Sequence, residues 1–174
     1  MFSLLVWLTT ATLGAVADVD GVADLELRHH GPPLPQTVLL IRHGEKPAKG
    51  NDLSKRGEQR AACLAVRYGT SNISHVYAYT DHPSHRPVET ITPLSKALNV
   101  SIDTSIGRDD FMELAQSVSK LSENATALVC WEHDALHDVA KALGVHGPPD
   151  YPSSEFDEVW TVREGKLTQA HENC

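Results

Sequence analysis

Two short apolar runs, each followed at once by charged and imidazole side chains, restrict the fold more than any other part of the chain. Thr37–Ile41 consists of β-branched and aliphatic residues, a composition typical of a strand buried on both faces of a parallel sheet. Arg42 and His43 follow it directly, and the second run, Thr126–Trp131, is followed by Glu132-His133-Asp134. A charge at the end of a buried strand is costly unless it is paired or meets a ligand. Both strand ends are therefore candidate functional positions.

Amphipathic helix patterns alternate with these and other strand patterns along the chain. The alternation predicts an α/β fold, a single-domain three-layer α/β/α sandwich with a mostly parallel central sheet. Ligands of such folds bind beyond the carboxyl ends of the strands, so we expect His43 and His133 to meet at one edge. The predicted helices are Ser54–Gly69, Arg86–Asn99 (broken or restarted near Pro93), Phe111–Leu121 and Asp134–Leu143, and further strands are predicted at His75–Tyr79, Ser101–Asp103 and in a hairpin around Glu164-Gly165.

The N-terminal region predicts secretion. Residues 1–17 form an uncharged apolar run that ends in Ala15-Val16-Ala17, the small-residue pattern of a signal-peptide cleavage site. The run is shorter than the ~20 apolar residues of a membrane span, which disfavours an anchor. Residues 18–36 are proline-rich and predict an extended lead-in, followed by one domain over 37–174. Three N-glycosylation sequons, at Asn72, Asn99 and Asn124, agree with passage through the secretory pathway.

Charge and cysteine content limit the partners and the cross-links. The formal net charge is −8, which argues against nucleic acid and anionic membranes as partners, because both demand a broad basic surface. A small anion needs only a local basic cluster. Cys63, Cys130 and Cys174 allow at most one internal disulfide, and the pairing stays open. The sequence predicts no particular oligomeric state.

Four motifs taken together resemble the histidine phosphatase (phosphoglycerate mutase-like) superfamily. They are RHGE at Arg42–Glu45, LSKRGEQRA from Leu53, HPSHRPVET with Arg86 and Thr90, and VCWEHD with His133. The order, spacing and strand context agree with that superfamily from Val38 to about Leu143. The chain is similar to a short form without large insertions.

The resemblance implies a phosphoryl-transfer site that uses no cofactor and no metal. Arg42 and Arg86 would bind the phosphoryl oxygens through their planar guanidinium groups. His43 would be the nucleophile that forms a phosphohistidine, which water then hydrolyses. His133 would contact the phosphoryl oxygens and stabilise the transition state. The implied substrate is a small phosphorylated molecule, and the implied enzyme is a phosphatase that acts on a phosphate monoester.

The proton donor for the leaving group is less clearly marked. Relatives of the mutase type use an acid downstream of the second arginine, and the candidates here are Asp109, Asp110 and Glu113. Asp110 is favoured, although these carboxylates could equally complement a helix dipole, and some short members of the superfamily manage without a dedicated donor. Glu45 is interpreted as a local hydrogen-bonding partner. Asp134 replaces the glycine that follows the second histidine in many relatives, and we expect it to cap the next helix and turn away from the phosphate.

Two other functions remain open at this level. His133 and His137 in HDALH form a variant of the zinc motif HExxH, to which His82 or His85 could add ligands. Asp is shorter than the Glu of that motif, and His133 lies at a strand-to-helix junction. The chain could also be a catalytically silent secreted module that kept the anion pocket, since fold does not imply chemistry. Hydrolysis is favoured over mutase activity because the connection from Arg86 to His133 is short and encloses little.

Overall fold

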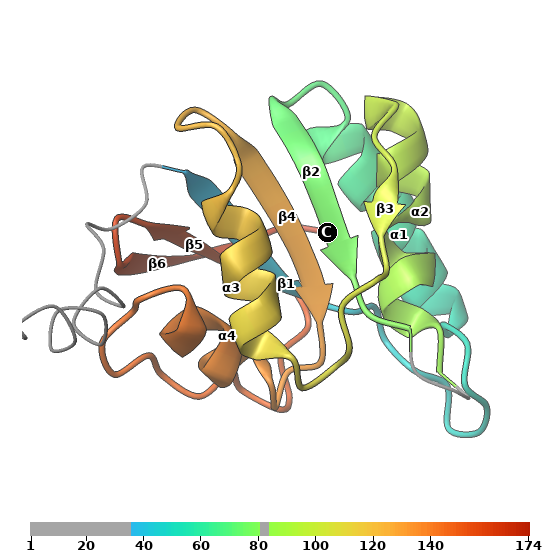
Figure 1. The fold of residues 1–174 in the computed structure, drawn as a ribbon. Helices are drawn as coiled ribbons and strands as arrows, with labels where there is room; N and C mark the ends of the chain where they lie inside the picture. Colours follow the sequence, from blue (N-terminus) through green and yellow to red (C-terminus); the bar gives the residue numbers. More distant parts are fainter. Residues whose placement is uncertain (1–35, 81–83) are drawn as a thin grey trace, which may run out of the picture. The chain divides into compact units, whose positions relative to one another are not determined.

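The structure is a computed structural model that describes residues 36–80 and 84–174. The predicted signal peptide at 1–17, and all of the predicted lead-in except Gln36, lie outside these residues. The described residues form six strands and four helices (Figure 1). The strands are β1 (Thr37–Arg42), β2 (Ile73–Ala78), β3 (Ile102–Asp103), β4 (Thr126–Trp131), β5 (Glu158–Arg163) and β6 (Lys166–His171), and the helices are α1 (Lys55–Tyr68), α2 (Arg86–Leu98), α3 (Phe111–Ser119) and α4 (Leu136–Ala142).

The strands form one mixed sheet in the order β3-β2-β4-β1-β5-β6. β1, β2, β3 and β4 run parallel, β5 pairs antiparallel with β1, and β6 completes the predicted hairpin. The two apolar runs are neighbours at the centre of the sheet, with Arg42 opposite Trp131 in the register. The polar residues that follow these strands consequently emerge side by side, as the sequence predicted.

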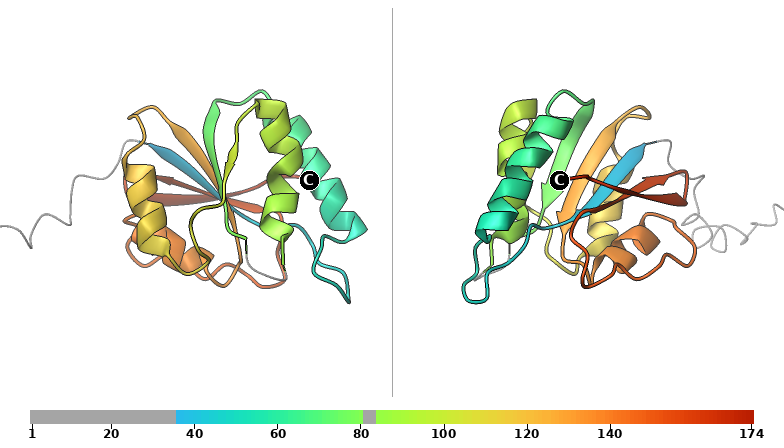
Figure 2. Two further views of the ribbon diagram at one scale, coloured as in Figure 1. Left: turned by 45° about the vertical axis from the view of Figure 1, so that its right-hand side comes forward. Right: turned by 180° about the vertical axis from the view of Figure 1, so that it is seen from behind.

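Helices cover both faces of the sheet, so the predicted three-layer α/β/α sandwich is confirmed. Figure 2 shows α1 and α2 packed together on one face and α3 with α4 on the other. Each face has its own apolar core. Trp131 and Trp160 are fully buried on the side of α3 and α4, and Leu64 and Ile91 are buried on the side of α1 and α2. No helix within residues 36–80 and 84–174 is long and apolar enough to cross a bilayer.

α1 begins where the sequence predicts and contacts the loop that follows β1. The Ser54 side chain caps the helix by accepting a hydrogen bond from the Gly57 amide at 3.1 Å. A Cβ atom at Gly57 would lie 2.6 Å from the carbonyl oxygen of Glu45. Glycine is therefore required at position 57, because the helix backbone packs directly against the loop that carries the RHGE residues.

α2 corrects one prediction, since it runs without interruption through Pro93. Pro93 has no N–H to donate to the carbonyl of Glu89, so one helical hydrogen bond is lost. Ile91 and Leu94 lie on either side of the proline and are fully buried against the sheet. This tertiary packing keeps the helix continuous, and the helix ends at Asn99, which has a left-handed backbone (φ 53°).

The C-terminal end is held against α1 by a disulfide between Cys63 and Cys174. Cys130 is the third cysteine and is buried as a free thiol in β4. Three cysteines allow at most one internal disulfide, and the structure contains one. It also selects the pairing, which the sequence left open.

Candidate active site

The polar loop after β1 is fixed by backbone and hydroxyl contacts. The His43 amide donates to the Trp131 carbonyl at 3.0 Å, which extends the β1–β4 pairing by one residue. The Gly44 amide donates to Oγ1 of Thr90 at 2.7 Å, and that hydroxyl donates to the Arg86 carbonyl at 2.7 Å. Thr90, one of the residues of the second arginine motif, thereby joins the start of α2 to the loop that carries His43.

The His43 ring is buried, and each of its nitrogens has a defined partner. Nδ1 lies 2.7 Å from the Gly44 carbonyl oxygen, and Nε2 lies 3.0 Å from Oε2 of Glu132. A carbonyl oxygen can only accept, so Nδ1 carries a hydrogen. Nε2 is therefore the ring nitrogen that could bond to a substrate, once it carries no hydrogen.

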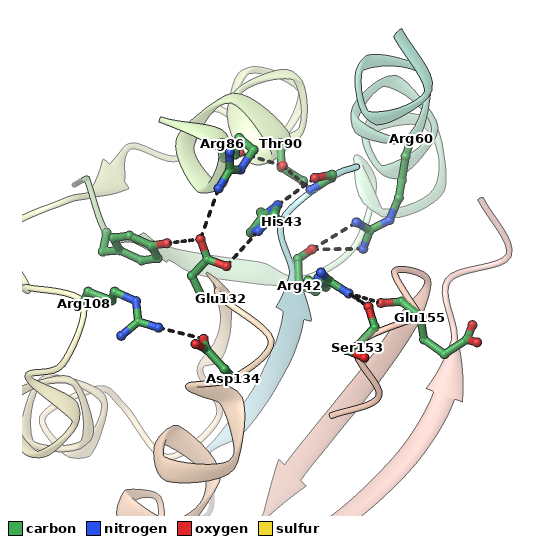
Figure 3. Close-up of polar contacts among 12 residues, drawn as sticks. Arg42, His43, Arg60, Arg86, Thr90, Arg108, Glu132, Asp134, Ser153 and Glu155 are labelled. Carbon is green, nitrogen blue, oxygen red and sulfur yellow. Dashed lines mark hydrogen bonds and ion pairs between the residues drawn. The ribbon is translucent and has the colours of Figure 1, made fainter. Parts of the chain in front are cut away.

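Glu132 lies at the centre of the cluster and was assigned no role by the sequence analysis. Its Oε1 accepts a hydrogen bond from the Tyr79 hydroxyl at 2.8 Å and lies 3.5 Å from Nη2 of Arg86 (Figure 3). Burial by itself raises the pKa of Glu132, but the hydrogen bonds and charges of His43, Tyr79 and Arg86 outweigh it and hold the pKa well below its usual value. The signal available in the sequence was its position directly after a buried strand and before His133.

Arg42 is held by a segment between α4 and β5. Nη1 donates to the carbonyl oxygens of Ser153 at 2.8 Å and Glu155 at 2.6 Å, and the guanidinium carbon lies 3.6 Å from the centre of the Phe156 ring. Burial lowers the pKa of Arg42, although a guanidinium remains charged at any physiological pH. The side chain is 4% exposed, so its direction is fixed before any ligand binds.

Three buried nitrogen atoms of the predicted site residues lack a hydrogen-bond partner among the residues that the structure describes. They are Nε of Arg42, Nε of Arg86 and Nδ1 of His133. Burial and the nearby charge of Arg42 lower the pKa of His133, so its imidazole is neutral near neutral pH. Buried polar atoms are nearly always satisfied. Oxygen atoms of a bound anion would satisfy the donors of this set.

The backbone of Arg42 is braced from the opposite side by an ion pair that the sequence analysis missed. Arg60 of α1 donates from both terminal nitrogens to the Arg42 carbonyl oxygen at 3.1 Å. Its Nε and Nη2 also donate to the carboxylate of Glu172, at 2.6 and 2.5 Å. Both side chains are almost completely buried. The C-terminal segment therefore supports the end of β1.

Asp134 corrects the prediction that it caps the next helix. The N-cap of α4 is Ala135, and Oδ1 of Asp134 instead accepts a hydrogen bond from Nη2 of Arg108 at 2.7 Å. Arg108 carries two carboxylate partners, Asp134 and Asp109. The positive charge of Arg108 neutralises Asp134. The aspartate therefore forms an ion pair beside the site, as Figure 3 shows.

The three predicted proton donors lie around the start of α3. Asp110 is the N-cap residue of α3, is exposed, and makes no side-chain hydrogen bond within the described residues. Asp109 pairs with Arg108. Glu113 lies in the first turn of α3 and is exposed. The carboxylate that contacts His43 is Glu132, so the choice of Asp110 as the acid stays a prediction.

Within the described residues, the group of possible metal ligands contains only one of the two histidines of the HDALH motif. Glu132, His133 and Asp134 each offer one ligand atom, and these atoms lie within 4.8 Å of one another. His137 of the HDALH sequence lies outside that group and faces Asp150 at 3.5 Å, and His82 lies outside the described residues. Two arginines already pair with the carboxylates of the group. These arginines already neutralise the two carboxylates, so a divalent cation would have to compete with them for its ligands.

A polar cavity of about 450 Å³ lies beside this cluster. It is bordered by Phe156, which contacts Arg42 and His43, and by Glu45, which pairs with Arg56 at 2.8 Å as the predicted local partner. The further lining residues are Gln59, Arg60, Ser154, Glu155, Asp157 and Cys174. The residues that line this cavity do not include Arg42, His43, Arg86 or His133, so the cavity adjoins the cluster through Phe156 and Glu45 and is not formed by it.

Comparison with solved structures identifies the architecture. The protein histidine phosphatase SixA, complexed with tungstate, superposes with a TM-score of 0.60 over 79% of this chain and 97% of its own, at 16% sequence identity. The chain has the fold of the histidine phosphatase superfamily. A phosphoglycerate mutase from Plasmodium falciparum (TM-score 0.52, 14% identity, 78% of this chain and 89% of its own) and mycobacterial hydrolase 1 (0.53, 11%, 79% and 98%) share the histidine phosphatase fold. No family model and no curated protein sequence matches the chain.

Proposed function

We propose that this protein is a secreted, metal-independent phosphatase that hydrolyses a small phosphate monoester through a phosphohistidine at His43. One observation carries the proposal. A negatively charged oxygen, Oε2 of Glu132, lies 3.0 Å from Nε2 of His43 while the same carboxylate faces Arg86. The site therefore accommodates an oxyanion against the nucleophilic nitrogen, which is the placement that a phosphoryl group needs.

The geometry supports the reaction in two steps. Nε2 of His43 forms a bond to phosphorus as the bond to the leaving oxygen breaks, and water then displaces the histidine and releases inorganic phosphate. Arg42 and Arg86 offer donors to the equatorial oxygens, on which negative charge is spread in the transition state. His133, kept neutral by its surroundings, offers a further ring nitrogen without repelling His43.

The fold comparison supports hydrolysis of a phosphorylated compound. SixA is described as a protein histidine phosphatase, and its structure contains tungstate, an oxyanion. The connection from Arg86 to His133 consists of α2, β3, α3 and β4 with their loops, so it is built from the elements of the fold itself and encloses little beyond them. Water is the second substrate of a phosphatase, so an accessible site favours hydrolysis over transfer back to a retained intermediate.

The positions of the sequons support secretion and glycosylation. Asn72 immediately precedes β2, Asn99 ends α2 ahead of β3, and Asn124 precedes β4. All three asparagines are exposed. They lie at the amino ends of parallel strands, whereas His43 follows a carboxyl end. Glycans at these positions would therefore leave the site open.

One observation favours the silent module as a second candidate. The Glu132 carboxylate occupies the position next to His43 that a phosphoryl group would take, and it repels a second anion. If it cannot be displaced, the pocket would not turn over a substrate. The test below distinguishes the two functions.

The test uses protein purified from the medium of a secreting eukaryotic cell that expresses the full chain. We expect EDTA-resistant release of phosphate from p-nitrophenyl phosphate, and an acid-labile phosphate trapped on the enzyme. His43→Ala should abolish both, because the nucleophile is lost. His146→Ala, which changes an exposed histidine outside the cluster, is the matched control. EDTA-sensitive activity would refute the metal-independent route. Phosphate binding without any turnover would favour the silent module.

A further inference from the structure

The contact between His43 and Glu132 fixes how many protons the two side chains share. Nδ1 of His43 carries a hydrogen because it faces the Gly44 carbonyl. The 3.0 Å contact between Nε2 and Oε2 needs one more hydrogen, since a bare imine nitrogen and a carboxylate would repel each other. The pair therefore holds one proton. The proton lies either on Nε2 of His43 or on the carboxyl group of Glu132.

The position of that proton decides whether His43 can attack and whether Glu132 repels the substrate. With the proton on Nε2, His43 has no lone pair for attack, and ionised Glu132 repels a phosphate dianion. With the proton on Glu132, Nε2 is nucleophilic and the carboxyl group is neutral. A bound phosphate dianion drives the transfer, because a neighbouring negative charge raises the pKa of a carboxyl group.

We propose, on the basis of the proposed function, that Glu132 is the catalytic acid and base of this site, in place of Asp110. Glu132 accepts the proton from Nε2 of His43 when the phosphate ester displaces its carboxyl group. Nε2 then forms its bond to phosphorus. The bond between phosphorus and the ester oxygen breaks, and Glu132 gives its proton to that oxygen, so that a neutral alcohol leaves.

The second step returns the site to its starting state. A water oxygen forms a bond to phosphorus, the bond between phosphorus and Nε2 breaks, and the ionised Glu132 accepts a proton from the water. Inorganic phosphate leaves, and the proton passes back to Nε2 as the carboxylate returns to His43. Atoms and charge balance over the cycle, and no further reactant is needed.

The surroundings of Glu132 allow this exchange. Tyr79 and Arg86 hold Oε1, on the side of the carboxylate away from the His43 contact, so Oε2 can leave the ring while the group stays anchored. Asp110 is exposed at the start of α3 and has no such anchor within the described residues. The titratable or charged side chains around Glu132 are Arg42 and His43 from the β1 end, Tyr79 after β2, Arg86 of α2, Arg108 before α3, and Cys130, His133 and Asp134 from its own segment.

Binding of inorganic phosphate tests the displacement without requiring turnover. Calorimetry at several pH values would compare the wild type with Glu132→Gln, and the ratio of the two Kd values at each pH cancels the titration of phosphate itself. We expect Glu132→Gln to bind phosphate about tenfold more tightly than wild type near neutral pH, because a like charge is removed. Glu123→Gln, an exposed loop change, should leave binding unaltered. Weaker or unchanged binding in Glu132→Gln would overturn the proposal.

The dependence on the leaving group tests the proton transfer. Glycerol 2-phosphate has a poor leaving group that needs a proton, whereas the p-nitrophenolate of p-nitrophenyl phosphate does not. We expect kcat of Glu132→Gln to fall by about 10²-fold or more on glycerol 2-phosphate and far less on p-nitrophenyl phosphate. Glu132→Asp keeps an acid and should recover part of the loss.

Asp110→Asn provides the opposite arm of that experiment. If it shows the leaving-group-dependent loss and Glu132→Gln does not, Asp110 is the acid and our assignment is wrong. A different result would refute the phosphohistidine route itself: phosphatase activity that survives in His43→Ala. Thermal unfolding of each variant checks that it is folded, and Glu132→Ala, which also lacks the acid, serves as the test variant if Glu132→Gln is not.

Discussion

Replacing Glu172 with Gln should destabilise the folded domain far more than a change at the third residue from the C-terminus would ordinarily do. The carboxylate accepts two hydrogen bonds from Arg60, at 2.6 and 2.5 Å, and both side chains are at most 3% exposed. Gln keeps the shape and one acceptor oxygen. It removes the charge that compensates the buried guanidinium.

The magnitude follows from the burial of the pair. Removing one partner of a buried ion pair costs about 3–5 kcal/mol, since an uncompensated charge remains in the interior. The retained acceptor places Glu172→Gln at the lower end, at about 3 kcal/mol. A domain is stable by about 5–15 kcal/mol, so the loss is a large share. It corresponds to a fall in Tm of roughly 6–12 °C for a chain of this size.

Urea denaturation followed by tryptophan fluorescence would measure the change. Asp134→Asn breaks the exposed pair with Arg108 and is the control, with an expected cost below about 1 kcal/mol. The double change Arg60→Met with Glu172→Leu should recover part of the stability, because no charge is left buried. A loss below about 1 kcal/mol in Glu172→Gln, with the disulfide intact by mass spectrometry, would refute the reasoning.

Two further changes test the supports of the site. Thr90→Val leaves the Gly44 amide without its acceptor and should cost about 1–3 kcal/mol, together with a lower kcat, because the loop carrying His43 loses its tie to α2; denaturation and steady-state kinetics measure the two effects, and a fully stable, fully active variant would contradict the role. Cys174→Ser opens a disulfide that spans 111 residues and should cost about 4 kcal/mol. Wild-type protein in dithiothreitol should lose the same amount, and a denaturation midpoint that does not move on reduction would argue against the cross-link.

The sheet was predictable because its central strands carry their signal locally. Thr37–Ile41 and Thr126–Trp131 consist almost entirely of apolar and β-branched residues, as is typical of strands covered on both faces, and the structure places them side by side and parallel. The helix boundaries were less predictable. Pro93 indicated a break in α2, but burial of its neighbours against the sheet offset one missing hydrogen bond. The sequence around Asp134 indicated a helix cap, but its carboxylate instead accepts a hydrogen bond from Arg108, which lies 26 residues earlier in the chain.

The amino-acid order alone was enough to place Arg42, His43 and His133 at neighbouring strand ends, because each follows or ends a recognisable strand and parallel strands share an edge; their roles stay predictions. The position of Arg86 at the start of a helix was likewise readable from a local pattern. The contacts that give these residues their chemistry came from elsewhere in the chain. The carbonyls of Ser153 and Glu155 direct Arg42, and the carboxylate of Glu172 supports its backbone through Arg60.

Glu132 shows the same division most clearly. A local pattern marked it as a polar residue after a buried strand, but its partners His43, Tyr79 and Arg86 lie at least 46 positions away along the chain. Short-range patterns reflect backbone propensity and periodic burial, which neighbouring residues determine. The charge state of a buried carboxylate depends on which distant donors surround it, and only the packing of the strands and α2 around one edge of the sheet decides that.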